Sequence, residues 1–313
     1  MESHQPEALL SSLGALVSLI RRERIQVINA HRAEGHLFAA LASLLVHQDV
    51  AVVRTRGDVR APKGHFLNKF LHCYLTDAVV LPAEVMRQPL QRLGLPPEKM
   101  RVIPFGVDLR DFPGDSSPKQ MRRILGWPEK EPVVGILGRL SPVKGHTVFL
   151  EAARLVLQVM PQTAFAIVGH EARIKIRDLK ELAERLGVAH RIRFIGFVAN
   201  VNVAIAAFDV AVVASTGSEV ICRVALEHMA MARPVVGTRI NAIPEIVVHE
   251  STGLLVPPED PRAMSEAILC LLKNPQKARD FGRAGRRRVM EQFTLDHQVR
   301  RTERLYRQLL KRR

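Results

Sequence analysis

The stretch VVGILGRLSPVKGH, Val133 to His146, places an apolar, β-branched run directly before a basic loop that contains two glycines. The loop carries Gly138, Arg139, Lys144 and Gly145, and a helical segment follows. Glycine allows the backbone to approach a ligand closely, and two cations neutralise a diphosphate. The stretch therefore predicts a strand, a phosphate-binding loop and a helix. A loop with two solvated cations is the alternative, whereas a Walker loop is excluded because it needs Gly-x4-Gly-Lys-Ser/Thr.

The same alternation of short β-branched runs and helical segments fills nearly the whole chain, which is typical of parallel βαβ units. A Pro-, Gly- and Ser-rich segment at 111–120 separates two series of strands. We therefore predict an α/β fold with two doubly wound lobes: a partial first lobe at 1–112, a linker at 113–120, a second lobe at 121–292 and a basic C-terminal helix at 293–313. The predicted strands are 27–29, 50–55, 78–82 and 101–105, then 133–137, 164–169, 191–196, 210–215, 234–238 and 253–257.

The first lobe is predicted to be incomplete. A doubly wound lobe grows outward from a central first strand, yet here a helix comes first and only four strands follow. The opening apolar run at 8–20 is preceded by acidic residues and runs into Arg21, so we expect an amphipathic helix and not a signal peptide. Near the C-terminus, helical spacing of Val299, Leu305, Leu309 and Leu310 predicts a helix that packs one face on a lobe.

Composition indicates anionic partners and a reducing compartment. The 313 residues are 47% apolar and carry a net charge of +15, and no run approaches the roughly 20 apolar residues that span a bilayer. The tail from Gln276 to Arg313 holds 13 Lys and Arg against 4 Asp and Glu, so +9 of the charge lies there. Three widely spaced cysteines, Cys73, Cys222 and Cys270, predict no disulfide and no metal site.

A second constellation, SEVICRVALEHMAMARPVV at 218–236, follows an apolar run and contains Glu219 and Glu227. In one helix the two carboxylates would be about 12 Å apart along the axis and could not grip one group together. We place Glu219 in the loop after the strand and Glu227 inside the following helix. Carboxylates are repelled by a diphosphate but accept hydrogen bonds from sugar hydroxyls, while N–H groups at the helix start, Ile221 to Val224, attract an anion. Two solvent-facing glutamates are the alternative.

With these motifs in order, the chain resembles glycosyltransferase family 4, a retaining group of GT-B fold. ILGRLSPVKGH is similar to the family's diphosphate loop, SEVICRVALEHMAMARPVVGT to its Glu-x7-Glu motif, and NAIPEIVVHESTGLLVPPED to the segment after it. RVIPFGVDLRDF and the EQFT…LYRQLL end also resemble family segments. The likeness covers the chain from about residue 25 onward.

The resemblance implies a role for each matching residue. Gly138, Arg139 and Lys144 would bind the donor diphosphate, together with the helix start at Ile221, Cys222, Arg223 and Val224. Glu227 would hold the ribose, and Glu219 the transferred sugar. We expect His31, Glu219 and Lys144 to act in catalysis, His31 as a first-lobe histidine at the end of a strand, although it could also only position the acceptor. The leaving phosphate would deprotonate the acceptor, without metal or other cofactor.

The chain also departs from the family. Cys222 and Arg223 occupy a segment where relatives have glycine, so we expect a bulkier side chain facing the donor sugar. Arg56 replaces a common histidine, and VVGHEAR lacks the usual second glycine. The opening strand and glycine-rich loop of the family are missing, so the alternatives of a nucleotide-sugar epimerase and an inactive nucleotide-sugar-binding fragment stay open.

For partners, the resemblance implies a nucleotide-sugar donor and a lipopolysaccharide, lipid-linked or other envelope-glycan acceptor, in a cytoplasmic protein. The basic tail predicts a peripheral contact with an anionic membrane face. Solvation alone and nucleic acid are the alternatives, and nucleic acid ranks lowest because only 5% of the residues are aromatic.

Overall fold

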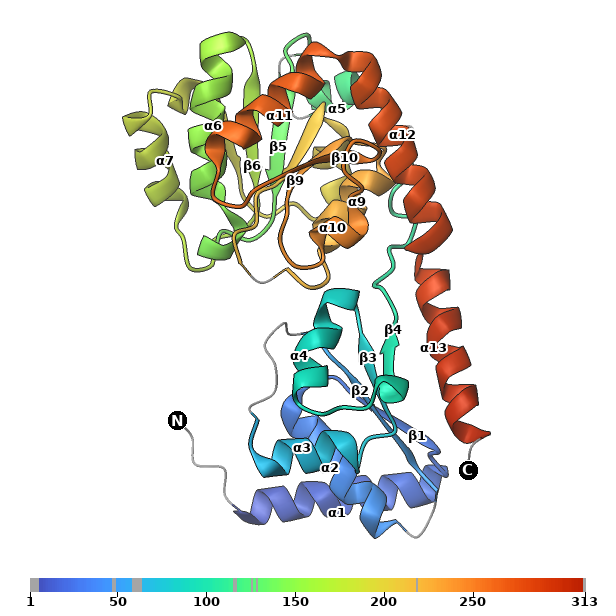
Figure 1. Cartoon of the computed structure of the whole chain (residues 1–313). Coiled ribbons are helices and arrows are strands. Elements are labelled where there is room, and N and C mark those ends of the chain that lie inside the picture. Colours follow the sequence, from blue (N-terminus) through green and yellow to red (C-terminus); the bar gives the residue numbers. More distant parts are fainter. Residues whose placement is uncertain are drawn as a thin grey trace. The chain divides into compact units, whose positions relative to one another are not determined.

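The computed structural model describes residues 6–46, 49–57, 64–114, 117–124, 126–127, 129–217 and 219–311. The chain divides into two compact units, the first formed by Met1–Pro104 with Gln298–Arg313 and the second by Phe105–His297 (Figure 1). The segment predicted as a linker, 113–120, lies inside the second unit, and its last residues begin a helix at Pro118.

The first unit is a four-stranded parallel sheet in the order β1-β2-β3-β4. On β2, Ala51 and Val53 pack toward Leu305 and Leu309 of α13, whereas Val52 packs with Ala39 of α2. This alternation follows from the period of two along a strand. The elements are α1 (Pro6–Glu23), β1 (Val27–Ala30), α2 (Ala33–Leu45), β2 (Ala51–Thr55), α3 (Phe66–Cys73), β3 (Ala78–Leu81), η1 (Glu84–Met86), α4 (Arg87–Arg92), η2 (Pro97–Lys99), β4 (Met100–Val102) and α13 (Leu295–Leu310).

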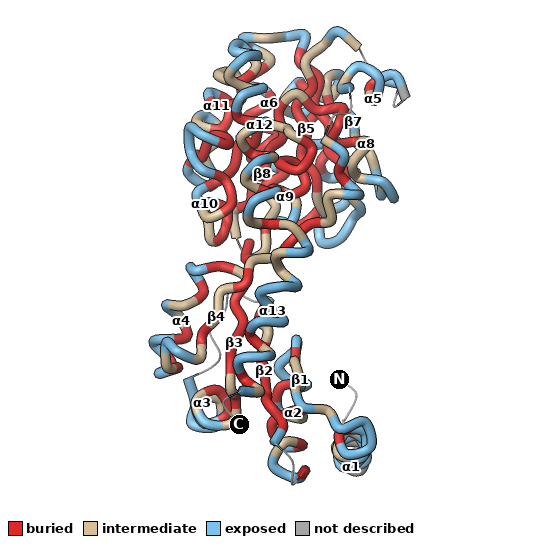
Figure 2. The backbone as a smooth tube through the Cα atoms, turned by 90° about the vertical axis from the view of Figure 1, so that its right-hand side faces the viewer, coloured by how far each residue is buried: buried red, intermediate tan, exposed pale blue. Residues whose placement is uncertain are grey.

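The second unit is a six-stranded parallel sheet in the order β10-β9-β8-β5-β6-β7. Val133 and Leu137 of β5 face a core cluster shared with α8 and α9, while Val134 and Ile136 face the cluster shared with α6 and α11. Helices therefore cover both faces of the sheet, and Figure 2 shows β5 and β8 buried between them. The elements are α5 (Pro118–Ile124), β5 (Val133–Leu137), η3 (Pro142–Lys144), α6 (His146–Val159), β6 (Ala164–Val168), α7 (Ile176–Arg185), η4 (Ala189–Arg191), β7 (Ile192–Ile195), α8 (Val201–Ala206), β8 (Val210–Val213), α9 (Arg223–Ala230), β9 (Val235–Thr238), α10 (Ile243–Ile246), β10 (Gly253–Val256), α11 (Pro261–Lys273) and α12 (Pro275–Gln292).

All ten predicted strands are present, with ends that shift by up to three residues. The amphipathic helix expected at the N-terminus is α1, which packs on α2 around Ile20 and Val46. The C-terminal helix buries Leu305 and Leu309 as predicted, but Val299 is 45% exposed. At 3.6 residues per turn it is rotated by roughly 100° around α13 from these two leucines. All three cysteines are free, as predicted, and no helix within the described residues has the length and apolar character to span a membrane.

Candidate functional site

The strand order of the second unit reverses between β5 and β8. From β5 the chain proceeds to β6 and β7 on one side, then crosses to β8, β9 and β10 on the other. Open α/β sheets bind ligands in the crevice outside the carboxyl ends of the two strands at such a reversal. The loop 138–145 leaves β5 there, and the loop 214–222 leaves β8. Both sequence motifs of the second lobe thus meet at one edge of the sheet.

The two loops touch through their backbones. Thr216 N donates to Val143 O at 3.0 Å, and Gly145 adopts a left-handed φ of +69°. A Cβ at Gly145 would lie 1.9 Å from Ala214 O, so only glycine permits this approach. The glycine that the sequence assigned to ligand approach is therefore required first by the neighbouring loop.

The side chain of Lys144 lies on a carboxylate of the other loop. Its Nζ is 2.5 Å from Glu219 Oε2, which also accepts a hydrogen bond from Ser215 Oγ at 2.7 Å. Glu219 is only 8% exposed. The cation assigned to the diphosphate and the acid assigned to the sugar thus form an ion pair with each other. Ser215 was missed by the sequence analysis, although a hydroxyl at the carboxyl end of a predicted strand was a usable signal.

Glu227 lies inside α9, on its fifth residue, as predicted, and Glu219 lies in the preceding loop. Glu227 is 5% exposed, and burial raises the pKa of its carboxyl, with Arg223 acting in the opposite direction. Arg223 Nε donates to Glu227 Oε1 at 2.7 Å, and its guanidinium also lies over the Phe105 ring, 5.8 Å from the centroid. A carboxylate has about four lone-pair positions, so one arginine uses only part of its accepting capacity.

Cys222 does not face the site as expected. It is 1% exposed and belongs to the core cluster that contains Ala225 and Leu226. Its φ of +43° lies in the left-handed region, which favours glycine over residues with a side chain. Burial raises the pKa of its thiol. The larger side chain that this segment does present to solvent is Arg223, which is 61% exposed.

The N-cap residue of α9, Cys222, makes no capping hydrogen bond with its side chain, so this side chain does not occupy the N–H groups at the start of the helix. The first N–H groups of a helix have no intrahelical acceptor and attract anions. Ile221 precedes this cap, and Arg223 and Val224 are the first two helical residues. Arg139 is exposed in the other loop. The structure therefore keeps these predicted residues at the same edge of the sheet.

Gly169, at the end of β6, supports the 138–145 loop from its other side. A Cβ there would lie 1.9 Å from Gly138 O, and its φ is +152°. From the sequence, only the absence of a second glycine after this strand was apparent. The glycine that is present supports the loop that carries Arg139 and Lys144.

In the first unit, His31 directly follows β1 and is exposed. In the same unit, His36 of α2 and His72 of α3 meet edge to face, 4.8 Å between ring centroids. Burial, the largest cause, and the charges of His72, Arg54 and Arg56 together lower the pKa of His36 to about 3. Arg56, which replaces a family histidine, is itself 7% exposed. The sequence analysis did not identify the histidine pair, because its members are 36 residues apart and match no motif.

Some arginines of the basic tail bind backbone carbonyl groups of the protein itself. Arg286 NH1 donates to Phe112 O at 2.9 Å and also to Ala230 O, and Arg288 donates to Glu245 O and Ile246 O at 2.8 and 3.0 Å. The run GRAGRRR at 282–288 therefore offers fewer cations to a binding partner than its composition indicates. In α13, Arg300, Arg301, Arg304 and Arg307 are exposed. Across the described residues, no cluster of three or more His, Cys, Asp or Glu could hold a metal ion.

Comparison with known proteins assigns both units to one class. Residues 3–111 match the family described as Glycosyltransferase Family 4, and residues 131–274 match Glycosyl transferases group 1. The chain belongs to the family 4 glycosyltransferases. The D-inositol 3-phosphate glycosyltransferase of Segniliparus rotundus is 30% identical over 279 residues, which are 87% of this chain. The chain spans 59% of the length of that curated relative.

Solved structures identify the fold as GT-B, with two parallel-sheet α/β units in one chain. A glycosyltransferase from Rickettsia africae superposes with a TM-score of 0.89 at 22% identity, over 99% of this chain and 84% of that one. Anabaena HepE, crystallised with UDP, superposes with a TM-score of 0.84 at 23% identity, over 96% and 82% of the two chains.

Proposed function

We propose that this chain transfers a glycosyl group from a nucleotide-sugar donor to an acceptor hydroxyl, with retention at the anomeric carbon. The observation that carries the proposal is the pairing of Lys144 with Glu219 at the strand reversal of the second unit. A cation and buried acids within hydrogen-bond reach of one another suit a ligand that contains both phosphates and hydroxyls. Solved complexes of HepE with UDP and with UDP-glucose support a nucleotide-sugar donor.

Donor binding would replace the contacts of the ligand-free site. A diphosphate offers Lys144 a more highly charged partner than Glu219, and Arg139 lies in the same loop. Glu219, released from the lysine, then accepts hydrogen bonds from sugar hydroxyls. Glu227 accepts from the ribose hydroxyls with the lone pairs that Arg223 leaves. The start of α9 adds N–H donors to the phosphates.

In this proposal the reaction is driven by stabilising the leaving group. As the bond between sugar and phosphate breaks, negative charge develops on the diphosphate, and Lys144, Arg139 and the α9 N–H groups stabilise it. The leaving phosphate oxygen takes the proton of the acceptor hydroxyl, and that hydroxyl oxygen bonds to the same face of the anomeric carbon. His31 of the first unit would position the acceptor or the sugar. Lys144, Arg139 and the α9 N–H groups would supply the charge stabilisation that Mg²⁺ supplies in other transferases, and no metal is invoked.

Two acceptor classes follow from different sources. The sequence resemblance implies a lipid-linked or lipopolysaccharide-type envelope glycan, whereas the curated relative is named for D-inositol 3-phosphate.

We propose a cytoplasmic protein with the exposed arginines of α13 contacting an anionic membrane surface. The protein should co-sediment with liposomes rich in phosphatidylglycerol at low salt. The variant Arg300→Glu/Arg304→Glu should lower the co-sedimented fraction more than the control variant Lys180→Glu/Arg185→Glu. No sedimentation at low salt would exclude the membrane contact.

The function itself is tested by calorimetry and product analysis. Among nucleoside diphosphates, at least one should bind, and the matching nucleotide sugar should release its diphosphate only when an acceptor is added. Mass spectrometry with a lipid-linked saccharide and with inositol 3-phosphate identifies the acceptor. Conversion of the sugar without acceptor would indicate the epimerase alternative instead. Binding of no nucleoside diphosphate at millimolar concentration would refute the donor site.

A further inference from the structure

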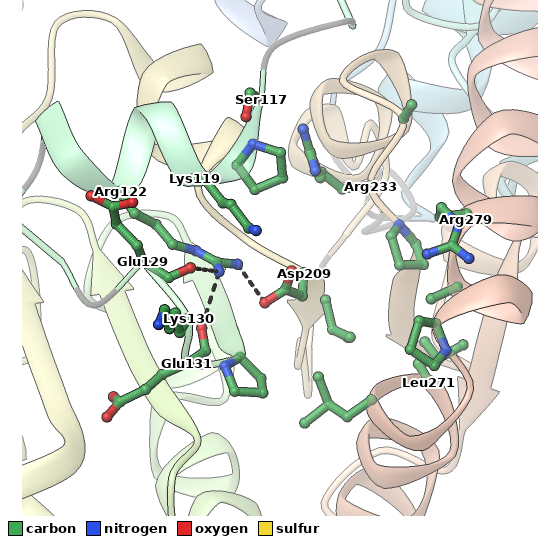
Figure 3. A pocket seen from close by; sticks show the side chains of 18 of the residues that line it. Ser117, Lys119, Arg122, Glu129, Lys130, Glu131, Asp209, Arg233, Leu271 and Arg279 are labelled. Carbon is green, nitrogen blue, oxygen red and sulfur yellow. Dashed lines mark hydrogen bonds and ion pairs between the residues drawn. The ribbon is translucent and has the colours of Figure 1, made fainter.

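A cavity opens at the ends of the strands opposite to those that carry the candidate site. It has a volume of about 690 Å³ and is lined by residues from α5, from the segment before β5, from the starts of β8 and β9, and from α11 and α12 (Figure 3). Pro132, Asp209 and Pro234 lie at the amino ends of the three strands, whereas the loops 138–145 and 214–222 leave the carboxyl ends. The cavity is therefore separate from the candidate donor site, within the same unit.

The lining is strongly basic. Five cations, besides Arg122, come from four separate segments of the chain: Lys119 from α5, Lys130 from the approach to β5, Arg233 before β9, and Arg279 and Arg283 from α12. Figure 3 shows Lys119 reaching from α5 toward the middle of the cavity. No hydrogen bond or ion pair of Lys119 or Lys130 is found among the described residues.

Each of the three acids of the lining is held by a different arginine, and among the five cations Arg283 also pairs with Asp280 of α12. Asp209 is paired with Arg122 and also accepts a hydrogen bond from Val133 N at 2.7 Å. Glu129 is held by Arg123 at 2.9 and 3.1 Å. Glu131 pairs with Arg191 at 2.9 Å, and Figure 3 shows its carboxylate directed away from the cavity.

Arg122 fixes the floor of the cavity. It is 4% exposed, and besides Asp209 it donates to Ala207 O at 2.9 Å and to Glu131 O at 3.0 Å. Arg233 is a second guanidinium of the lining and is partly buried; burial lowers its pKa to about 10 while Asp209 opposes the shift. It remains cationic at neutral pH, and an anion in the cavity would stabilise it. A rigid, charged floor is what a specific anion site requires.

The rest of the lining defines the ligand more closely. Its described residues include four prolines and several aliphatic side chains but no Phe, Tyr, Trp or His, so among them there is no ring on which a nucleobase would stack. The volume falls in the range of small-molecule sites. We infer that this cavity binds a phosphorylated sugar or polyol that lacks a nucleobase, with the phosphate groups held by Lys119, Lys130 and the neighbouring arginines.

The test uses fructose 1,6-bisphosphate, fructose 6-phosphate and fructose as probes of the full chain by isothermal titration calorimetry. Affinity should fall in that order, because each phosphate adds charge-assisted hydrogen bonds, and fructose alone should give no binding. The variant Lys144→Ala should bind fructose 1,6-bisphosphate as wild type does, which separates this cavity from the donor site and from the proposed function.

The variant Lys119→Ala/Lys130→Ala should raise the dissociation constant for fructose 1,6-bisphosphate by about tenfold or more. Both lysines are exposed, so its melting temperature should stay at the wild-type value. The matched control Lys180→Ala/Arg185→Ala removes the same charge from exposed positions of α7 and should leave the affinity unchanged. Equal weakening by both double variants, loss of binding in Lys144→Ala, or no binding of either phosphate ester would overturn the inference.

Discussion

Replacing Glu227 with glutamine should have opposite effects on stability and on donor binding. Burial raises the pKa of this carboxyl above its ordinary value of 4.5. The contribution of the Glu227 carboxyl to the free energy of unfolding is therefore fully present below the ordinary pKa of 4.5, and it is lost as the pH rises through the folded-state pKa. Glutamine has a similar shape but does not ionise. At pH 7 the ligand-free variant should thus have a higher free energy of unfolding than wild type, and the difference should shrink toward pH 4.

Donor binding should change in the other direction. Hydrogen bonds from neutral donors to a charged acceptor contribute about 1.5 to 3 kcal/mol, and the amide forms weaker ones. The dissociation constant for the nucleoside diphosphate should therefore rise roughly ten- to hundredfold. The same substitution removes the charge that attracts Arg223, whose Nε lies 2.7 Å from Glu227 Oε1.

Urea unfolding at pH 5 and pH 8 measures the first effect, and isothermal titration calorimetry with the nucleoside diphosphate that binds wild type measures the second. Glu266→Gln is the control, since Glu266 is an exposed glutamate on α11 and should change neither quantity. A Glu227→Gln variant that binds this nucleotide as tightly as wild type would refute the ribose role. Lower stability of that variant at pH 8 would refute the argument from burial.

Three further predictions concern the loops of the same site. Lys144→Ala leaves Glu219 buried without its cation, so the ligand-free protein should lose about 1 to 3 kcal/mol in urea unfolding and turnover should fall strongly, whereas wild-type turnover would contradict the diphosphate role. Gly169→Ala places a Cβ 1.9 Å from a carbonyl oxygen of the 138–145 loop, so calorimetry should show weaker binding of the nucleoside diphosphate that binds wild type; unchanged affinity would contradict the role of Gly169 in supporting the loop. Cys222 is 1% exposed with a raised thiol pKa, so mass spectrometry after brief iodoacetamide treatment should find it unmodified while the other two cysteines react; labelling of Cys222 in the folded protein would contradict its burial.

The elements of the fold were predictable because their signals are local. A strand such as Val133–Leu137 is apolar on both faces, as expected for a sheet covered by helices on both sides, and a glycine-containing loop ends it. The position of Glu219 in a loop and Glu227 in a helix also followed from the sequence, since the apolar run ends just before the first and helical residues surround the second.

What the sequence did not reveal depends on contacts between distant segments. The inward direction of Cys222 follows from a left-handed backbone angle, which a cysteine does not indicate. The ion pair of Lys144 with Glu219 joins residues 75 apart in the sequence. The basic cavity at the amino ends of the strands is assembled from cations of α5, α12 and other segments that look like ordinary solvated charges in the sequence. Arg286 and Arg288 were assigned to a binding surface because composition does not distinguish a cation in solvent from one held by carbonyl groups.

The backbone contact between the loops 138–145 and 214–222 has a consequence for protein engineering. Because Thr216 donates to Val143 and Gly145 lies against Ala214, neither loop can change its path without displacing the other. A chimera that receives one of these loops from a relative should therefore be defective even when the donated sequence is functional in its own protein. Exchanging both loops together, as a single cassette, keeps the contact intact and is the way to transfer donor specificity between members of the family.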